Sequence, residues 1–195
     1  MKIVIASENQ GKLKEFREIL SPLNFEVISK KEAGILEEIE ETGKSFQENA
    51  RIKAEYIFNK TKEMTIADDS GLEVFSLGNR PGIFSARYGE ENGMKTTDEK
   101  NNLKLLEEMK KIKDRRARYV CALCFINKKG EIFNIIETVE GEIATKPKGR
   151  NGFGYDCLFL YQGKTFGETD SKIKNQVSHR GKAMEKLLKN IKSWV

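Results

Sequence analysis

A predicted β-hairpin constrains the fold of this chain more than any other feature. Two long β-rich runs, Arg118 to Asn127 and Ile132 to Thr145, are joined by a short segment that contains Lys128-Lys129-Gly130, and so short a connection permits only an antiparallel pair. The chain opens differently, because Lys2 to Ser7 is typical of a short buried strand and the apolar residues from Leu13 to Leu20 recur at helical spacing. A strand-helix opening together with an antiparallel hairpin predicts a mixed α/β protein.

The segments that follow the opening continue the alternation of strands and helices. Phe25 to Ser29 is a candidate strand, and Gly34 to Gly43 is acidic and irregular in pattern. Ser45 with Glu48 three residues later forms a capping-box pattern, which predicts the start of a helix of about four turns.

The middle of the chain carries two strand candidates, Met64 to Asp68 and Leu72 to Leu77, on either side of Ser70-Gly71. Asn79 to Gly82 has strong turn chemistry. The apolar spacing from Asp98 to Lys111 predicts a helix.

The end of the chain is expected to hold a loop, a strand and a helix. Lys146 to Gly154 is a glycine-containing loop, Tyr155 to Tyr161 is a strand candidate, and Ala183 to Ile191 marks a final helix with Ser178 as its candidate cap. No linker separates two independent halves, so a single domain over residues 1–195 is expected.

Composition agrees with one globular domain. The chain has 195 residues, of which 38% are hydrophobic and 33% charged, enough to bury a sizeable core. The early apolar stretch Ile3 to Ala6 is followed at once by Glu8 and Lys12, too soon for a signal-peptide core or a membrane span. We therefore expect a cytoplasmic protein with no membrane partner.

The formal charge of +5 favours an anionic partner, but acidic residues are interspersed with the basic ones. A small phosphate ligand fits this charge as well as nucleic acid does. Of the three cysteines, Cys121 and Cys124 form a CxxC inside a strand-like run, where residues three apart point to opposite faces. No second pair completes a zinc site, so buried core thiols are predicted.

The segment Ser7-Glu8-Asn9-Gln10-Gly11-Lys12 leaves a strand and enters a helix. Such an end offers free backbone amides, a favourable dipole, a glycine that permits close approach and a lysine, which together suit phosphate. It is not a Walker loop, because it has one glycine and Leu13 stands where a serine or threonine would hold magnesium. The alternative is an ordinary turn with a solvated lysine.

Asp68-Asp69-Ser70-Gly71 places two acids at the end of an apolar strand. Neighbouring side chains in a strand face opposite ways, so we expect unequal roles for the two carboxylates. Magnesium needs hard oxygen ligands, and one or two carboxylates with substrate phosphates suffice. The acidic stretch Glu37 to Glu41 could supply a further ligand. A turn and a solvated acidic surface are the alternatives.

Two later segments could contact a nucleotide base. In Gly149 to Asp156 glycines flank Phe153, whose face could stack on a base, although a hairpin loop with a core aromatic fits equally. Ser178-His179-Arg180 stands at a helix start with Lys174 upstream, and it could donate to a phosphate or a purine oxygen. The alternative is a helix cap with surface charges.

Taken in order, these segments resemble the Ham1/inosine triphosphate pyrophosphatase family, also called XTP/dITP diphosphatases. The resemblance is collinear across nearly the whole chain and rests on order and spacing. The matching pieces are Asn9, Lys12, Glu40-Glu41-Thr42-Gly43, Phe46, Glu48-Asn49-Ala50, Lys53, Ala67-Asp68-Asp69-Ser70-Gly71-Leu72, Pro81-Gly82, Ser85-Ala86-Arg87-Tyr88, Gly152-Phe153-Gly154-Tyr155-Asp156 and Ser178-His179-Arg180. Two departures are Ser7, where threonine is common, and Cys157, where proline is common.

The resemblance implies an elongated mixed β-sheet flanked by helices, with two lobes, a central nucleotide-binding cleft and a homodimeric assembly. It also implies Mg²⁺-dependent hydrolysis of ITP, dITP and XTP to the monophosphate and pyrophosphate. Asp69 would be catalytic base and metal ligand, and Glu40 a second metal contact, with Glu41 left open beside it. The residues implied to hold the triphosphate are Ser7, Glu8, Asn9, Gln10, Gly11, Lys12 and Lys53. Those implied to line the nucleotide pocket are Ser70, Phe153, Gly154, Tyr155, Asp156, Lys174, His179 and Arg180.

Two other functions stay open at this point. One is a pyrophosphatase for modified pyrimidine triphosphates, which a related fold could support. The other is a nucleic-acid-binding module, suggested by the net charge and by the basic run Lys110 to Arg118, although the interleaved aromatics of a single-strand platform are missing there.

Overall fold

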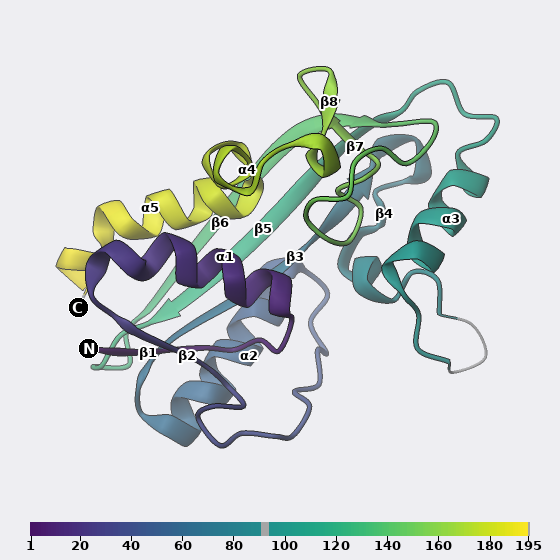
Figure 1. Ribbon diagram of the computed structural model, residues 1–195. Helices are drawn as coiled ribbons and strands as arrows, with labels where there is room; N and C mark the ends of the chain where they lie inside the picture. The colour runs from purple at the N-terminus through teal and green to yellow at the C-terminus, as the bar shows by residue number, and fades with distance from the viewer. Residues whose placement is uncertain (91–93, 195) are drawn as a thin grey trace. The chain divides into compact units, whose positions relative to one another are not determined.

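A sheet with both parallel and antiparallel pairs organises the chain (Figure 1). This computed structural model describes residues 1–90 and 94–194. Eight strands are found there, in the order β2-β1-β3-β5-β6-β7-β8, with β4 paired to β3. Their bounds are β1 Lys2–Ile5, β2 Glu26–Ser29, β3 Met64–Val74, β4 Arg80–Pro81, β5 Arg116–Ile126, β6 Ile132–Ile143, β7 Phe159–Tyr161 and β8 Lys164–Thr165.

The strand pairings confirm the predicted mixed α/β class. β1 runs parallel to both of its neighbours, so that Val4 lies opposite Ile28 of β2 and Thr65 of β3. β6 pairs with β7, and β7 with β8, in antiparallel fashion. β5 and β6 are neighbours joined by a short turn in which Asn127 N donates to Glu131 O at 3.1 Å, which is the expected hairpin.

Five α-helices and four 3₁₀ segments connect the strands among the described residues. The helices are α1 Gln10–Leu20, α2 Phe46–Thr61, α3 Asp98–Glu108, α4 Ser171–Val177 and α5 His179–Trp194. The 3₁₀ segments are η1 Ser21–Leu23, η2 Phe75–Leu77, η3 Gly82–Arg87 and η4 Phe166–Glu168. No helix in the described parts of the chain is long and apolar enough to cross a membrane.

The chain forms two compact units built from interleaved segments. Unit 1 consists of residues 1–69, 121–137 and the segment from Arg180 onward, and unit 2 consists of residues 70–120 and 138–179. Strands β3, β5 and β6 and helix α5 therefore contribute residues to both units. The expectation of a single domain stays a prediction.

Unit 1 has a core that shows the alternation of strand residues directly. Ile3 and Ile5 of β1 pack in one cluster with α1 and α5, whereas Val4 between them is buried outside that cluster. Figure 1 shows α1 and α5 lying next to each other over the strands of this unit. One face of the strands thus packs against α1 and α5. Unit 2 has its own core, which includes Leu72, Leu105, Tyr119, Phe159 and Phe166.

The two cysteines of the CxxC follow the same alternation. Cys121 belongs to the cluster under α1 and α5, while Cys124 interacts electrostatically with Arg51 and Glu55 of α2. Both are buried free thiols, as predicted, and burial raises the pKa of each to about 12. They remain protonated and act as small apolar core residues.

Two strand predictions were wrong. β3 is one continuous strand from Met64 to Val74 rather than two strands on either side of Ser70-Gly71, because flanking residues in both cores keep the backbone extended. The predicted strand from Tyr155 to Tyr161 begins only at Phe159, since Asp156 and Leu158 N–H groups close turns onto Phe153 and Tyr155. At the start of this segment, the hydrogen-bonded turns override the local preference for a strand.

Helix boundaries differ from the predictions in smaller ways. α1 already begins at Gln10, because Asn9 Oδ1 accepts from Lys12 N at 3.0 Å and caps the first turn. Ser45 caps α2 as predicted, accepting from Glu48 N, but the Glu48 carboxylate reaches Lys44 N instead of closing the box. α3 ends three residues earlier than predicted, and α4 and β8 were not predicted.

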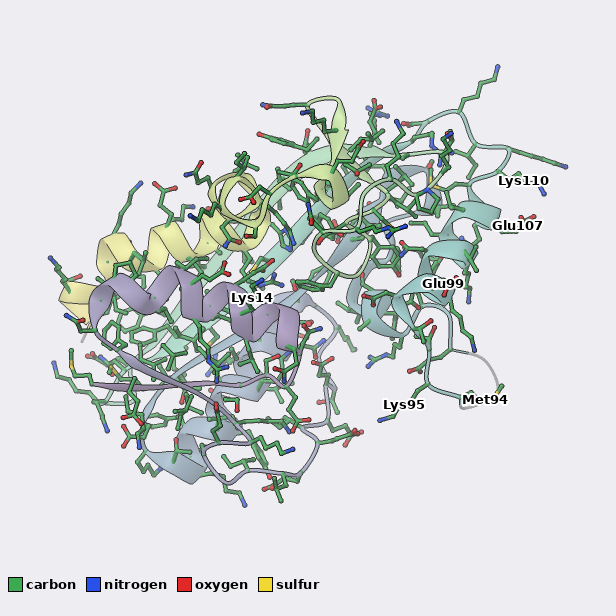
Figure 2. The ribbon with its side chains drawn as sticks, viewed as in Figure 1. Lys14, Met94, Lys95, Glu99, Glu107 and Lys110 are labelled. Atoms are coloured by element: carbon green, nitrogen blue, oxygen red, sulfur yellow. The ribbon has the colours of Figure 1, made fainter. Side chains whose placement is uncertain are left out.

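The core of unit 1 gives a stability prediction on α1. Phe16 is fully buried there, so Phe16→Ala should lower the free energy of unfolding by about 3 to 5 kcal/mol. Lys14, labelled in Figure 2, has a side chain 71% exposed, and Lys14→Ala should change it by less than about 0.5 kcal/mol. Urea unfolding followed by circular dichroism measures both. Equal losses in the two variants would contradict the assigned face of α1.

Candidate active site

The start of α1 presents the predicted phosphate loop in unit 1. Ser7 Oγ accepts from Asn9 N at 3.2 Å, and Asn9 in turn caps the helix by accepting from Lys12 N. Gln10 and Gly11 form the first helical turn, and Glu8, Asn9 and Gln10 are exposed. An ordered turn with an accessible helix start is suited to a phosphate group.

β3 directs Asp68 toward α1 and α5. Ile66, two residues earlier on the strand, packs in the core under these helices, and Asp68 follows on the same side. Its Oδ2 lies 3.0 Å from Lys12 Nζ and 3.1 Å from Arg180 Nη2. Arg180 also pairs with Glu15 of α1. The carboxylate of Asp68 thus joins the phosphate loop to α5.

β3 directs Asp69 to the opposite face, toward α2. Asp69 Oδ1 lies 3.5 Å from Lys53 Nζ, and Asp69 Oδ2 accepts from Asn49 Nδ2 at 3.2 Å. Lys53 Nζ also lies 2.7 Å from Glu41 Oε1. Asn49 Oδ1 accepts from Gly43 N. This bond ties the acidic segment from Gly34 to Gly43, called the acidic loop below, to α2. The two adjacent acids therefore have separate sets of partners.

The pKa values of the two acids are shifted in opposite directions. Burial disfavours the charged form of Asp68, but attraction to Lys12, Arg180 and Lys53 outweighs it and holds the pKa of this carboxyl well below its usual range. Burial raises the pKa of Asp69 above its usual value, although Lys53 and Lys12 oppose the shift. Asp68 is thus a fixed anion, and Asp69 is the better proton acceptor of the pair.

Glu41 lies nearer to these groups than Glu40 does. Glu41 shares Lys53 with Asp69, so two carboxylates converge on one cation, whereas Glu40 is exposed. Among residues 1–90 and 94–194, no three His, Cys, Asp or Glu side chains gather as a metal site. The pair still offers the hard oxygen donors that Mg²⁺ takes when phosphates complete its shell.

Lys30 is a site residue that the sequence pattern did not reveal. It follows β2 and is 7% exposed, and its Nζ donates to Glu37 O at 2.6 Å and lies 3.1 Å from Glu8 Oε1. This one ammonium group joins the phosphate loop to the acidic loop. No local motif marks such a lysine, because its partners are brought together only by the pairing of β1 with β2.

Asp156 organises the predicted base-binding residues of unit 2. Its Oδ2 accepts from Lys174 Nζ at 2.7 Å and from Phe153 N at 2.9 Å, and its Oδ1 accepts from Tyr119 O–H at 3.3 Å. Lys174 Nζ also lies 4.8 Å from the centre of the Phe153 ring. A Cβ on Gly152, whose φ is +76°, would come within 2.0 Å of Asp156 Oδ2, so only glycine fits there.

The remaining predicted pocket residues are placed differently. Tyr155 is buried, and its O–H donates to Ser85 O, so its side chain belongs to the core of unit 2. His179 stacks on Tyr119 with ring centres 4.6 Å apart. Ser70 is half-buried on β3. Arg180 is 2% exposed and engaged by two carboxylates, so its expected role as a donor to a purine oxygen stays a prediction.

The basic run from Lys110 to Arg118 is largely engaged within unit 2. Arg116 pairs with Asp114, Arg118 pairs with Glu73, and Arg115 donates to the carbonyl groups of Met109, Ile143 and Ala144. Each internal partner reduces the charge offered to an external phosphate. The run resembles an anchored strand start more than a nucleic-acid surface.

Unit 1 of this α/β protein therefore has a capped helix start beside a strand that bears two buried acids. A model of the Ham1 family matches residues 3–190. The protein named dITP/XTP pyrophosphatase from Bacillus subtilis is 47% identical over 95% of this chain and 94% of its own length. A protein of the same name from Clostridium tetani is 43% identical over 99% and 97% of the two chains.

Solved structures agree with these sequence matches. The structure of the Staphylococcus aureus Ham1 protein is similar to this chain with a TM-score of 0.86 and 41% sequence identity, and the match covers 99% of both chains. The chain belongs to the Ham1 family.

The charge network around Asp68 gives a prediction on stability and its pH dependence. Asp68→Asn leaves Arg180 and Lys12 buried without their shared anion and should lower the free energy of unfolding by about 3 to 5 kcal/mol at pH 7. Because the folded-state pKa of Asp68 is lowered, its contribution is present above the unfolded-state pKa and disappears as the pH falls through the folded value. The variant should therefore lose less stability on acidification.

Urea unfolding between pH 3 and pH 7, an interval of about four units that includes the usual aspartate pKa, measures this difference. Asp114→Asn is the matched control, since Asp114 pairs with Arg116 at the surface and its loss should lower the free energy of unfolding far less than the loss of Asp68. Parallel pH curves for wild type and Asp68→Asn would show that Asp68 is not the ionised anchor.

Proposed function

We propose that this chain is a nucleoside triphosphate pyrophosphatase that hydrolyses ITP, dITP and XTP to the nucleoside monophosphate and pyrophosphate. The proposal rests on the different surroundings of two neighbouring acids on β3. Asp68 is held as an anion beside Lys12, and Asp69 has a raised pKa beside Lys53. The names of the relatives from Bacillus subtilis and Clostridium tetani support the substrate class.

The triphosphate binds to unit 1 in this proposal. The turn Ser7 to Lys12 offers backbone N–H groups and the positive end of α1 to phosphate oxygens. Lys12 and Lys53 are each held by an aspartate at 3.0 and 3.5 Å, so both ammonium groups are already in place. They offset the charge that accumulates on the leaving pyrophosphate.

Asp69 is the general base of the proposed reaction. It takes a proton from the water that attacks the α-phosphorus, the bond from the α-phosphorus to the bridging oxygen breaks, and pyrophosphate leaves. Asn49 and Lys53 hold the two oxygens of Asp69 in position. The raised pKa makes the carboxylate of Asp69 a stronger base.

We further propose that Mg²⁺ is the cofactor. The carboxylates of Asp69 and Glu41, which share Lys53, supply oxygen donors of the kind it prefers, and Glu40 is the neighbouring candidate. When bound, Mg²⁺ neutralises phosphate charge and favours ionisation of a bound water.

The base binds to unit 2 in this proposal, against Phe153 and beside Lys174. Hypoxanthine and xanthine carry an oxygen at position six, which accepts from a cationic donor, whereas adenine carries an amino group there. An unpaired buried donor costs about 1 to 3 kcal/mol, so adenine would be disfavoured roughly tenfold to a hundredfold. A homodimer and a cytoplasmic location complete the proposal, and the molar mass in solution tests the first.

Pyrophosphate release tests the proposed function. The purified protein is compared on ITP, XTP, dITP, GTP and methylated pyrimidine triphosphates at equal concentration with Mg²⁺ present. We expect the highest kcat/KM for the first three. A preference for the pyrimidine triphosphates would replace the substrate class, and salt-sensitive binding of oligonucleotides without release from any triphosphate would favour the nucleic-acid module.

Replacing the proposed base tests its role. Asp69→Asn should lower kcat on ITP by roughly a hundredfold to ten-thousandfold and change the affinity for ITP little, because the amide keeps the size but accepts no proton. The acid limb of the wild-type pH profile should lie above the usual aspartate pKa, in the direction of the raised value. Near-normal turnover of Asp69→Asn with Mg²⁺ would remove Asp69 from this role, and Asp114→Asn controls for loss of a charge.

The choice between Glu40 and Glu41 has its own test. Because Glu41 shares Lys53 with Asp69, Glu41→Gln should raise the Mg²⁺ concentration for half-maximal activity roughly tenfold, and Glu40→Gln should raise it less. Titration of activity with Mg²⁺ after treatment with a chelator measures both. The reverse order would assign the metal contact to Glu40, as the family resemblance implied.

A further inference from the structure

Two residues of α3 hold the loop that carries Phe153. Asp98 Oδ2 accepts from Gly154 N at 2.6 Å, and Asn102 Nδ2 donates to Gly154 O at 2.9 Å. Asp98 and Asn102 are one helical turn apart, so both face the same side of α3. The N–H and the C=O of a single residue, next to Phe153 in the chain, are therefore bound by one helix.

The other side of this loop residue is also fixed. Phe153 N donates to Asp156 Oδ2, so Asp156 binds the N–H of Phe153 while α3 binds the next residue. A cavity of about 390 Å³ is lined by both α3 and this loop. Its lining includes Asn102, Leu103 and Leu106 of α3 and Arg150, Phe153 and Cys157 of the loop. Hydrogen bonds, rather than close packing, set the position of the loop on this side.

Asn102 destabilises the fold relative to an apolar residue if its only role is to fill space. It is 6% exposed, and its Oδ1 has no hydrogen-bond partner among the described residues. A buried amide with an unsatisfied acceptor is less stable than an apolar side chain of similar size. The bond from Nδ2 to Gly154 O is what an apolar residue could not supply.

We propose that Asp98 and Asn102 are positioning residues that fix the base-binding loop through Gly154 and thereby set the discrimination among purine bases. This inference rests on the proposed function, since it assigns the loop to the base. Both side chains belong to unit 2, whereas the residues proposed to bind phosphate belong to unit 1, so we expect their effect on base selection and not on phosphate binding.

The test compares substrates with and without a base. Asp98→Ala and Asn102→Ala should each lower kcat/KM for ITP roughly threefold to tenfold and reduce the ratio of ITP to GTP. Inhibition by inorganic tripolyphosphate, which has no base, should stay within about twofold of wild type, since it reports only on the phosphate groups.

Conservative variants separate positioning from loss of folding. Asp98→Asn keeps an acceptor for Gly154 N and should restore most of the selectivity lost in Asp98→Ala. Asn102→Asp replaces the donor by an acceptor facing Gly154 O and should be at least as impaired as Asn102→Ala. Glu107→Gln is the matched control, because the exposed Glu107, labelled in Figure 2, lies on α3 and is not part of the lining of this cavity.

Amide hydrogen exchange at Gly154 gives a readout that needs no activity. It should be faster in Asp98→Ala than in wild type and unchanged in Glu107→Gln. An unchanged ITP to GTP ratio, an equal change in tripolyphosphate inhibition, or unchanged exchange would each overturn the inference. If wild type releases pyrophosphate from no triphosphate, the proposed function fails, and the exchange rates alone decide whether α3 holds the loop.

Discussion

An ionised carboxylate that is 1% exposed requires cations at close range, and Asp68 has them in Lys12 and Arg180. Each cation belongs to a different helix, so the buried charge couples the start of α1 to the start of α5 through β3. Removing it would leave two cations without their shared anion, and such losses are among the most destabilising changes in a core. The start of α1, which we propose binds phosphate, is therefore held in place by the carboxylate of Asp68.

The alternation of side chains along β3 gives Asp68 and its neighbour Asp69 different surroundings. Because Asp68 faces α1 and α5, its neighbour Asp69 must face α2, where it meets Lys53 and Asn49. Unequal surroundings then move the two pKa values apart, which is how adjacent carboxyl groups acquire different chemistry. A bend at Ser70-Gly71 would have destroyed this arrangement, and the continuous strand preserves it.

Unit 2 also contains a buried carboxylate with several partners, that of Asp156. Asp156 gathers a lysine, a tyrosine and a backbone N–H around one carboxylate, and α3 holds the adjacent Gly154 from another side. Buried polar groups with several partners have few alternative arrangements, which suits a loop that must present an aromatic ring in one orientation.

Much of this protein follows from local pattern alone. The hairpin of β5 and β6, the cap of α2 at Ser45, the buried CxxC and the unequal faces of Asp68 and Asp69 all depend on residues close in sequence, whose geometry is set by strand and helix periods. The partners of those residues are another matter. Other contacts join segments that are distant in the sequence. They are the ion pairs of Arg180 with Asp68, of Lys30 with Glu8 and of Glu41 with Lys53, and the hydrogen bond from Gly154 N to Asp98. The sequence by itself determined the elements and which side each acid takes. Only the tertiary structure decided what each acid meets there, because burial and charge pairing depend on how the strands are ordered in the sheet.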